Sequence, residues 1–141
     1  TAAALAAAAE IEQYTPEMGA LLEEPWHKGD AKEKAIALME AYVSFAARHH
    51  AILRVRNLAA DEGNRRFHEV RHAAVSKMHK LLETRIAVAN NGLDPSSGAS
   101  AILSLMERIA AIARLPLRRS HSRKSLINAA AFLVAGALAE D

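Results

Sequence analysis

The sequence predicts an all-α protein, a helical bundle of about six helices that forms one domain over residues 1–141. Apolar side chains recur at intervals of three and four residues through most of the chain, which is helical spacing. Alanine is abundant, runs of β-branched residues are scarce, and only 6 glycines and 4 prolines occur. This composition favours helix over strand. A chain of this length can bury a single core without disulfides or metals.

Alanine-rich residues 2–14 predict the first helix. Thr15-Pro16 should interrupt it, because proline disfavours a helical conformation in the residue before it. Pro16 can also open the next helix, which we expect from Glu17 to about Glu24. Residues 25–29 then predict a loop that contains proline and glycine.

Asp30 predicts the N-cap of a further helix, with Glu33 in the capping-box position. The apolar spacing that follows continues for more than 25 residues, which is long for one helix of a compact domain. We therefore expect a bend at Arg48 to His50 and two helices. Gly63 predicts the stop of the second one.

Three further boundaries divide the rest of the chain. Asn90-Asn91-Gly92 should end a long helix that begins after Asn64. Pro95 and Pro116 bracket a helix over residues 95–114. The last helix is expected from about Ser122 to Ala139, with a broad apolar face.

Composition excludes several classes of function. The chain has no cysteine, so disulfides and thiol chemistry are absent. A formal net charge of +2 is too small to indicate a nucleic-acid-binding domain. No apolar run is long enough for a membrane span, and no export signal opens the chain. We expect a cytoplasmic protein with no membrane partner and no cofactor.

His68-Glu69-Val70-Arg71-His72 matches the H-E-x-x-H pattern of zinc hydrolases. Two histidines four residues apart share a helix face and can bind zinc, with the glutamate as general base. A catalytic site needs a third ligand, and His79 on the same helix would lie roughly 16 Å along the axis from His68. A solvated polar helix face is therefore preferred, and no catalytic or metal-binding residue is predicted. A zinc-dependent hydrolase using His68, Glu69 and His72 remains an alternative.

A ligand pocket is a second candidate feature. The chain has few aromatic residues, and its 4 methionines are spread through the predicted helices. Such residues at helical spacing often form a packed core, but methionine also provides an adaptable lining for an apolar cavity. Glu107-Arg108 is the sharper signal, because a charged pair between apolar neighbours is costly unless it is satisfied. Glu107 either lies at an exposed helix edge or interface, or it is the polar group of a cavity.

The two predicted helices after Pro95 are too apolar for one exposed surface, which makes a homodimer through these helices plausible. The basic segment Arg118, Arg119, His121, Arg123 and Lys124 is a candidate for contact with phosphate. A charged loop is more often only solvated.

Several segments together resemble the C-terminal ligand-binding and dimerisation domain of TetR-family transcriptional regulators. Ala41 to Phe45 followed by Arg48 to Arg54 resembles the junction of that family's fifth and sixth helices. Gly92 to Pro95 followed by Leu103 to Arg108 resembles the eighth helix, and Ala131 to Leu138 the ninth. Asn57 to Asp61 resembles the end of the sixth helix, and Ala2 to Glu10 would be the fourth.

The resemblance implies a homodimer that pairs through its last two helices and binds a hydrophobic small-molecule effector between helices. Binding would shift the fourth helix and change DNA binding by an N-terminal helix-turn-helix domain, which we expect upstream of residue 1. Operator DNA would be bound only through that domain. A stand-alone helical dimerisation module is the other alternative.

Site residues follow from the resemblance together with helical spacing. Ligand-lining positions would be Met39, Tyr42, Phe45, Val70, Ala74, Met78, Leu81, Leu103, Met106 and Glu107. Dimer-interface positions would be Ser104, Arg108, Ile112, Leu126, Ile127, Ala130, Val134 and Leu138.

Overall fold

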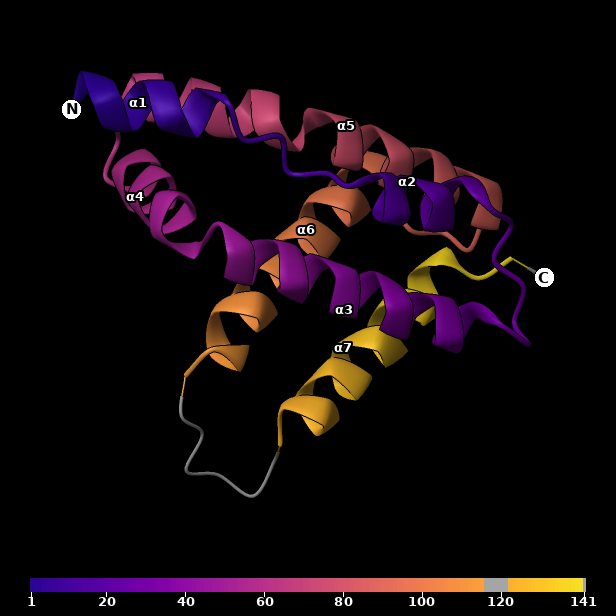
Figure 1. Ribbon diagram of the computed structural model, residues 1–141. Helices are drawn as coiled ribbons and strands as arrows, with labels where there is room; N and C mark the ends of the chain where they lie inside the picture. The colour runs from indigo at the N-terminus through magenta and orange to yellow at the C-terminus, as the bar shows by residue number, and fades with distance from the viewer. Residues whose placement is uncertain (116–121, 141) are drawn as a thin grey trace.

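The computed structural model describes residues 1–115 and 122–140, and in them the chain forms seven helices and no strand (Figure 1). The helices are α1 (Ala2–Ala9), α2 (Pro16–Glu23), α3 (Ala31–Arg48), α4 (His50–Asp61), α5 (Arg65–Ala89), α6 (Pro95–Ala113) and α7 (Arg123–Leu138). The predicted all-α bundle is confirmed.

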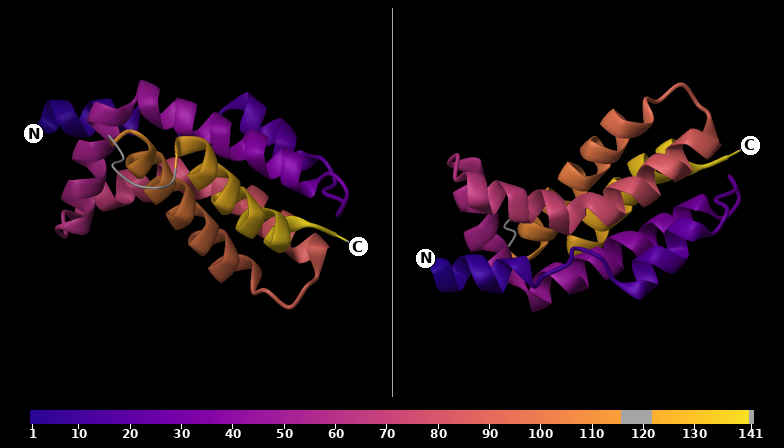
Figure 2. Two further views of the ribbon diagram at one scale, coloured as in Figure 1. Left: turned by 90° about the horizontal axis from the view of Figure 1, so that it is seen from below. Right: turned by 90° about the horizontal axis from the view of Figure 1, so that it is seen from above.

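The long helices cross around one core. α3 packs against α6 and α7, and α5 packs against α6 and α4. α1 and α2 lie along α5 (Figure 1). Seen from below, α6 and α7 lie side by side on one face of the molecule (Figure 2, left). The main core fills the space between α2, α3, α5, α6 and α7, and a smaller apolar cluster lies between α1, α4 and α5.

The first helix is shorter than predicted. α1 ends at Ala9, and residues 10–15 form an irregular segment rather than the helix expected to residue 14. This segment is held by tertiary contacts, because the Gln13 N–H donates to the Ala74 carbonyl of α5 at 3.0 Å. Thr15 then caps α2 by accepting a hydrogen bond from the Met18 N–H.

Asp30 is the N-cap residue of α3, as predicted, but the predicted capping box is wrong. The Asp30 side chain makes no capping bond to that helix. Instead its carboxylate accepts a hydrogen bond from the His27 N–H at 2.9 Å, which closes the turn between α2 and α3. Trp26 in this turn is fully buried in the main core.

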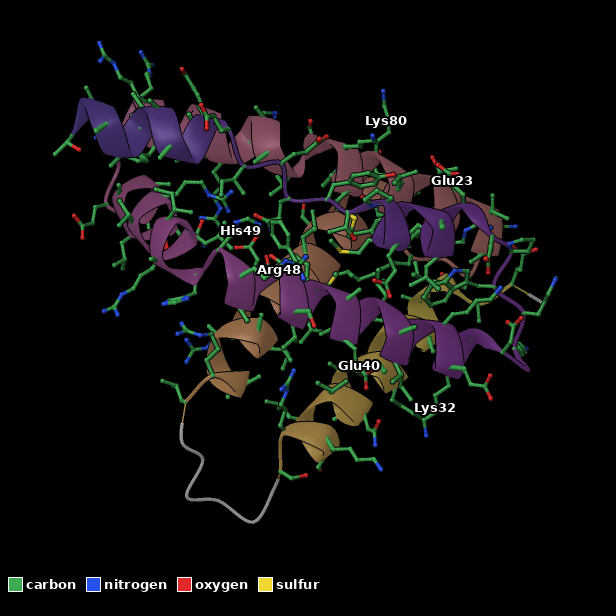
Figure 3. The ribbon with its side chains drawn as sticks, in the orientation of Figure 1. Glu23, Lys32, Glu40, Arg48, His49 and Lys80 are labelled. Carbon is green, nitrogen blue, oxygen red and sulfur yellow. The ribbon has the colours of Figure 1, made fainter. Side chains whose placement is uncertain are left out.

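The predicted bend between two helices is confirmed. α3 ends at Arg48 and α4 begins at His50, with the intervening His49 at φ −118° and ψ 19°, outside the helical region. Figure 3 shows Arg48 and His49 at this junction. The His49 ring lies 5.0 Å from the Phe45 ring, so the bend is anchored to the core through an aromatic contact.

The predicted stops at Asn90 and Gly63 also hold, whereas the predicted boundary at Pro116 lies outside the described residues. Asn90 ends α5 in the left-handed conformation at φ 49°, which asparagine tolerates better than most residues. Gly63 adopts φ 94° in the turn after α4. Pro95 opens α6, where the Asp94 carboxylate caps the Ser97 N–H at 2.9 Å.

Arg85 on α5 binds two parts of the chain that are distant in sequence, the end of α2 and the segment after α7. Its guanidinium donates to the Leu22 and Glu23 carbonyls at the end of α2, at 3.1 and 3.3 Å. It also pairs with Glu140 at 3.2 Å. Since the Glu140 N–H donates to the Trp26 carbonyl at 2.7 Å, the end of the chain is fixed beside the turn between α2 and α3.

None of the helices in the described parts of the chain is long and apolar enough to cross a membrane.

Candidate functional site

A buried polar cluster joins five segments of the chain at one end of the main core. Gln13 comes from the segment between α1 and α2, Tyr42 from α3, Arg56 from α4, Arg71 from α5 and Glu107 from α6. We call these five residues the Gln13 cluster.

Gln13 lies at the centre of the cluster and is fully buried. Its side-chain amide donates to the Tyr42 hydroxyl and, at 3.4 Å, to Glu107 Oε1. Its carbonyl oxygen accepts from Arg56 Nη2 at 2.6 Å. The carboxamide therefore uses its donor side against α3 and α6 and its acceptor side against α4.

Arg56 is only 1% exposed, yet it has no carboxylate partner. It donates to Gln13 and, at 3.0 Å, to the Asn57 side chain. Nη1 is buried without a hydrogen-bond partner. Among residues 1–115 and 122–140, no acidic side chain lies within ion-pairing distance of this guanidinium. A buried charge left in this way is costly.

Arg71 and Glu107 form the ionic part of the cluster. Arg71 Nη2 pairs with Glu107 Oε2 at 3.0 Å, while Nη1 pairs with Asp61 at 3.0 Å. Both oxygens of Glu107 are thus bound, one by Arg71 and one by Gln13. The charge of Glu107 inside the apolar run of α6 is explained by these contacts.

Burial shifts two of the acid–base equilibria in the cluster. The pKa of Tyr42 is raised well above its usual range, first by burial and then by the nearby charge of Glu107. Its hydroxyl therefore stays protonated and neutral. Burial also lowers the pKa of Arg56, while Glu107 opposes that shift. Arginine starts from a very high pKa, so the guanidinium remains charged at neutral pH.

Most of the predicted lining residues meet in the main core. Met39, Tyr42, Phe45, Met78, Leu103 and Met106 are buried there, and Leu81 packs against them partly exposed. All 4 methionines of the chain are fully buried in this core. Val70 lies instead at the smaller cluster between α1, α4 and α5. Ala74 is buried and accepts the Gln13 N–H, and Glu107 belongs to the Gln13 cluster.

Gln13 and Arg56 are not among the predicted site residues, and Arg71 has no predicted site role. Arg56 carries a detectable signal, because it shares the buried face of α4 with Leu53 and Ala60 at helical spacing. Gln13 carries none, since it lies within the helix predicted over residues 2–14. Glu107 is marked in the sequence by the charged pair Glu107-Arg108 between apolar neighbours.

Two surface hollows lie away from these residues. One, of about 460 Å³, is bounded by the start of α3, the end of α5 and the end of α7, and includes Lys32, Asn91 and Phe132. The other, of about 430 Å³, lies between α3 and the start of α7 and includes Glu40, Arg123 and Ile127. Figure 3 shows Lys32 and Glu40 on α3. None of the predicted ligand-lining residues bounds either hollow.

The H-E-x-x-H motif lies in the first half of α5, where His68, Glu69 and His72 are all exposed. Over residues 1–115 and 122–140, no group of three or more His, Cys, Asp or Glu side chains is placed to hold a metal ion. Val70 within the motif faces the small apolar cluster, and Arg71 belongs to the Gln13 cluster. The zinc alternative therefore gains no support.

The predicted dimer-interface residues divide into two groups. Ile127, Ala130, Val134 and Leu138 are buried in the core of the subunit itself, so they are not open to a partner. Ser104 and Arg108 are exposed on α6, whereas Ile112 and Leu126 are partly buried. On α7 the side open to solvent carries Phe132 and Leu133, which are 69% and 61% exposed.

In the predicted basic segment, Arg118, Arg119 and His121 lie outside the described residues. Arg123 and Lys124 are exposed in the first turn of α7.

Comparison with known proteins gives one match. The family model described as the tetracyclin repressor-like C-terminal domain matches residues 19–134, which include α3, α4, α5 and α6 and most of α2 and α7. No curated protein and no solved structure matched the chain. Domains of this kind belong to regulatory proteins. Because the match covers most of its length, the chain belongs to the TetR-like C-terminal domain family.

Proposed function

We propose that this chain is the effector-sensing domain of a TetR-type transcriptional regulator and that it binds a hydrophobic small molecule between α3, α5 and α6. The observation that carries the proposal is the methionine-rich core beside the Gln13 cluster. Met39, Met78 and Met106 come from these three helices and are fully buried. Methionine side chains have many rotamers and repack around a guest at low cost.

The Gln13 cluster gives this core a polar end. Tyr42 and Glu107 present a hydroxyl and a carboxylate from α3 and α6. Effector sites in proteins are mostly apolar with a few convergent polar groups, which is the composition found here. An effector would place its apolar body among the methionines and its polar end at the cluster.

The proposed mechanism runs through α1. This helix contacts α4 and α5 and is followed by the segment that carries Gln13. An effector that repacks the core would change the position of α1 and, through it, the DNA affinity of an N-terminal helix-turn-helix domain. Operator binding belongs to that domain, and two subunits would pair through α6 and α7 in the cytoplasm.

A thermal-shift screen with lipophilic ligands tests the proposal. We expect at least one ligand to raise the Tm of the wild-type chain, because a ligand that binds only the folded state stabilises it. Tyr42→Ala and Glu107→Ala should reduce that rise by altering the polar end of the site. Lys80→Ala, on the exposed side of α5, serves as the control and should leave the response unchanged. Failure of every ligand class to shift the Tm would count against an effector-sensing domain.

A further inference from the structure

The Gln13 carboxamide fills a polar socket whose walls come from three helices. Tyr42 on α3, Arg56 on α4 and Glu107 on α6 each contact it. Its carbonyl faces the guanidinium at 2.6 Å, and its amino group faces both the hydroxyl and Glu107. Gln13 itself lies outside any helix, so a short irregular segment holds the group in place.

The walls define which chemical groups can replace this carboxamide. The Arg56 side requires an acceptor, because a guanidinium has only donors. The Glu107 side requires a donor, because an ionised carboxylate only accepts. A carboxylate in the socket would be repelled by Glu107, and an ammonium would be repelled by Arg56. A neutral group with an acceptor beside a donor, such as an amide, satisfies both walls.

Arg56 supplies an additional reason for a ligand at this position. Its Nη1 is buried without a partner, and within residues 1–115 and 122–140 no carboxylate lies within ion-pairing distance of the guanidinium. A ligand carbonyl placed between Nη1 and Nη2 would satisfy the donor that Gln13 leaves free. Hydrogen bonds from a charged donor are stronger than those between neutral groups.

We propose that the effector carries an amide-type head group, which displaces the Gln13 carboxamide and binds Tyr42, Arg56 and Glu107 in its place. This inference rests on the proposed effector-sensing function and specifies the chemistry of its ligand. The apolar body of the effector lies in the adjoining methionine-rich core.

Displacement of Gln13 acts on the segment that leads out of α1. This segment is held to α5 by the Gln13 N–H bond to Ala74 at 3.0 Å and by Lys77, whose ammonium lies 4.1 Å from the centre of the Tyr14 ring. A head group that expels the Gln13 side chain removes the segment's contacts with α3, α4 and α6. The segment then loosens, and α1 is held only by its own contacts with α4 and α5.

Chemical rescue tests the socket directly. Gln13→Ala removes the carboxamide, and acetamide supplies the same group from solution. At acetamide concentrations several times its Kd, we expect the Tm of this variant to rise by about 3 °C. Wild type and Glu12→Ala, an exposed neighbour in the same segment, should not respond. A rise of equal size with acetate or methylammonium would overturn the assignment, as would the absence of any rescue in a folded variant.

A second measurement uses the wild-type chain and so does not depend on the folding of the variant. Decanamide, decanoate, decanol and decylamine share one apolar chain and differ in their head group. We expect decanamide to bind at least tenfold more tightly than the others and to speed hydrogen exchange over residues 10–15. Equal binding of all four compounds would agree with the proposed sensor function but would contradict the proposal of an amide-type head group. If none binds, the proposed sensor function is contradicted, and the acetamide rescue alone decides whether the socket accepts an amide.

Discussion

Glu107 shows how one charge is retained in an apolar helix. Its two oxygens bind Arg71 and Gln13, and its charge opposes the effect of burial on the pKa of Arg56. Glu107→Gln keeps the shape and removes the charge, so Arg71 loses an ion pair and Arg56 loses a favourable nearby charge. We expect the variant to lose about 1.5–3 kcal/mol of unfolding free energy, the range for hydrogen bonds to charged groups. Urea unfolding followed by circular dichroism measures the difference.

The control is Glu69→Gln, which makes the same chemical change at an exposed position of α5. Its effect should stay within about 0.5 kcal/mol, as is usual for surface substitutions. Equal stability of Glu107→Gln and wild type would mean that Arg56 and Arg71 do not need the carboxylate.

At the scale of the element, α2 depends on a residue that lies far away in the sequence. Arg85 donates to the Leu22 and Glu23 carbonyls, which have no partner within the helix, and pairs with Glu140. Arg85→Met keeps a flexible, unbranched side chain but removes the guanidinium, which leaves these acceptors unpaired. We expect a loss of about 2–3 kcal/mol, because unsatisfied buried acceptors retain their desolvation cost. Denaturant unfolding measures the loss, and hydrogen exchange should quicken over residues 16–27.

Lys80→Met on the same helix provides the matched control. Figure 3 shows Lys80 on α5 pointing away from the rest of the molecule, and it is exposed. Its replacement should change stability by no more than about 0.5 kcal/mol. If exchange over residues 16–27 is the same in Arg85→Met and wild type, Arg85 does not hold α2.

Helix boundaries were predictable where local chemistry sets them. Asn90, Pro95 and the bend at His49 act within one or two turns of the chain, and the structure confirms each of them. The end of α1 was not predictable, because the helix propensity of Glu10, Glu12 and Gln13 favours continuing the helix. Tertiary contacts with α5 override that preference.

The candidate site was predictable only in part for the same reason. Tyr42 and Glu107 stand out from their own helical patterns. Gln13 acquires its role from side chains that are 29, 43 and 94 residues away, so nothing in its local sequence marks it. Arg56 was open to detection, since its spacing with Leu53 and Ala60 places it on the buried face of α4.

At the scale of the whole molecule, the face formed by α6 and α7 is the candidate surface through which two copies of the chain would associate. Phe132 and Leu133 are the most exposed large apolar side chains of the described helices. They lie on the exposed side of α7, and Ser104 and Arg108 are exposed on α6, which packs beside α7 (Figure 2, left). Ala101 on α6 and Ala129 on α7 are also exposed and are small enough to allow close approach of another helix. Exposed apolar groups of this kind mark association surfaces.

A pair of matched substitutions tests whether this face joins two copies of the chain. Leu133 on α7 and Leu58 on α4 are 61% and 50% exposed. Replacing either leucine with aspartate therefore removes a similar amount of exposed apolar surface. In a two-fold interface each substitution occurs twice, once in each subunit. We therefore expect light scattering at micromolar concentration to find a dimer for wild type and for Leu58→Asp, and a monomer for Leu133→Asp that keeps its helical circular dichroism. A monomeric wild type, or dissociation by both variants alike, would contradict pairing through α6 and α7.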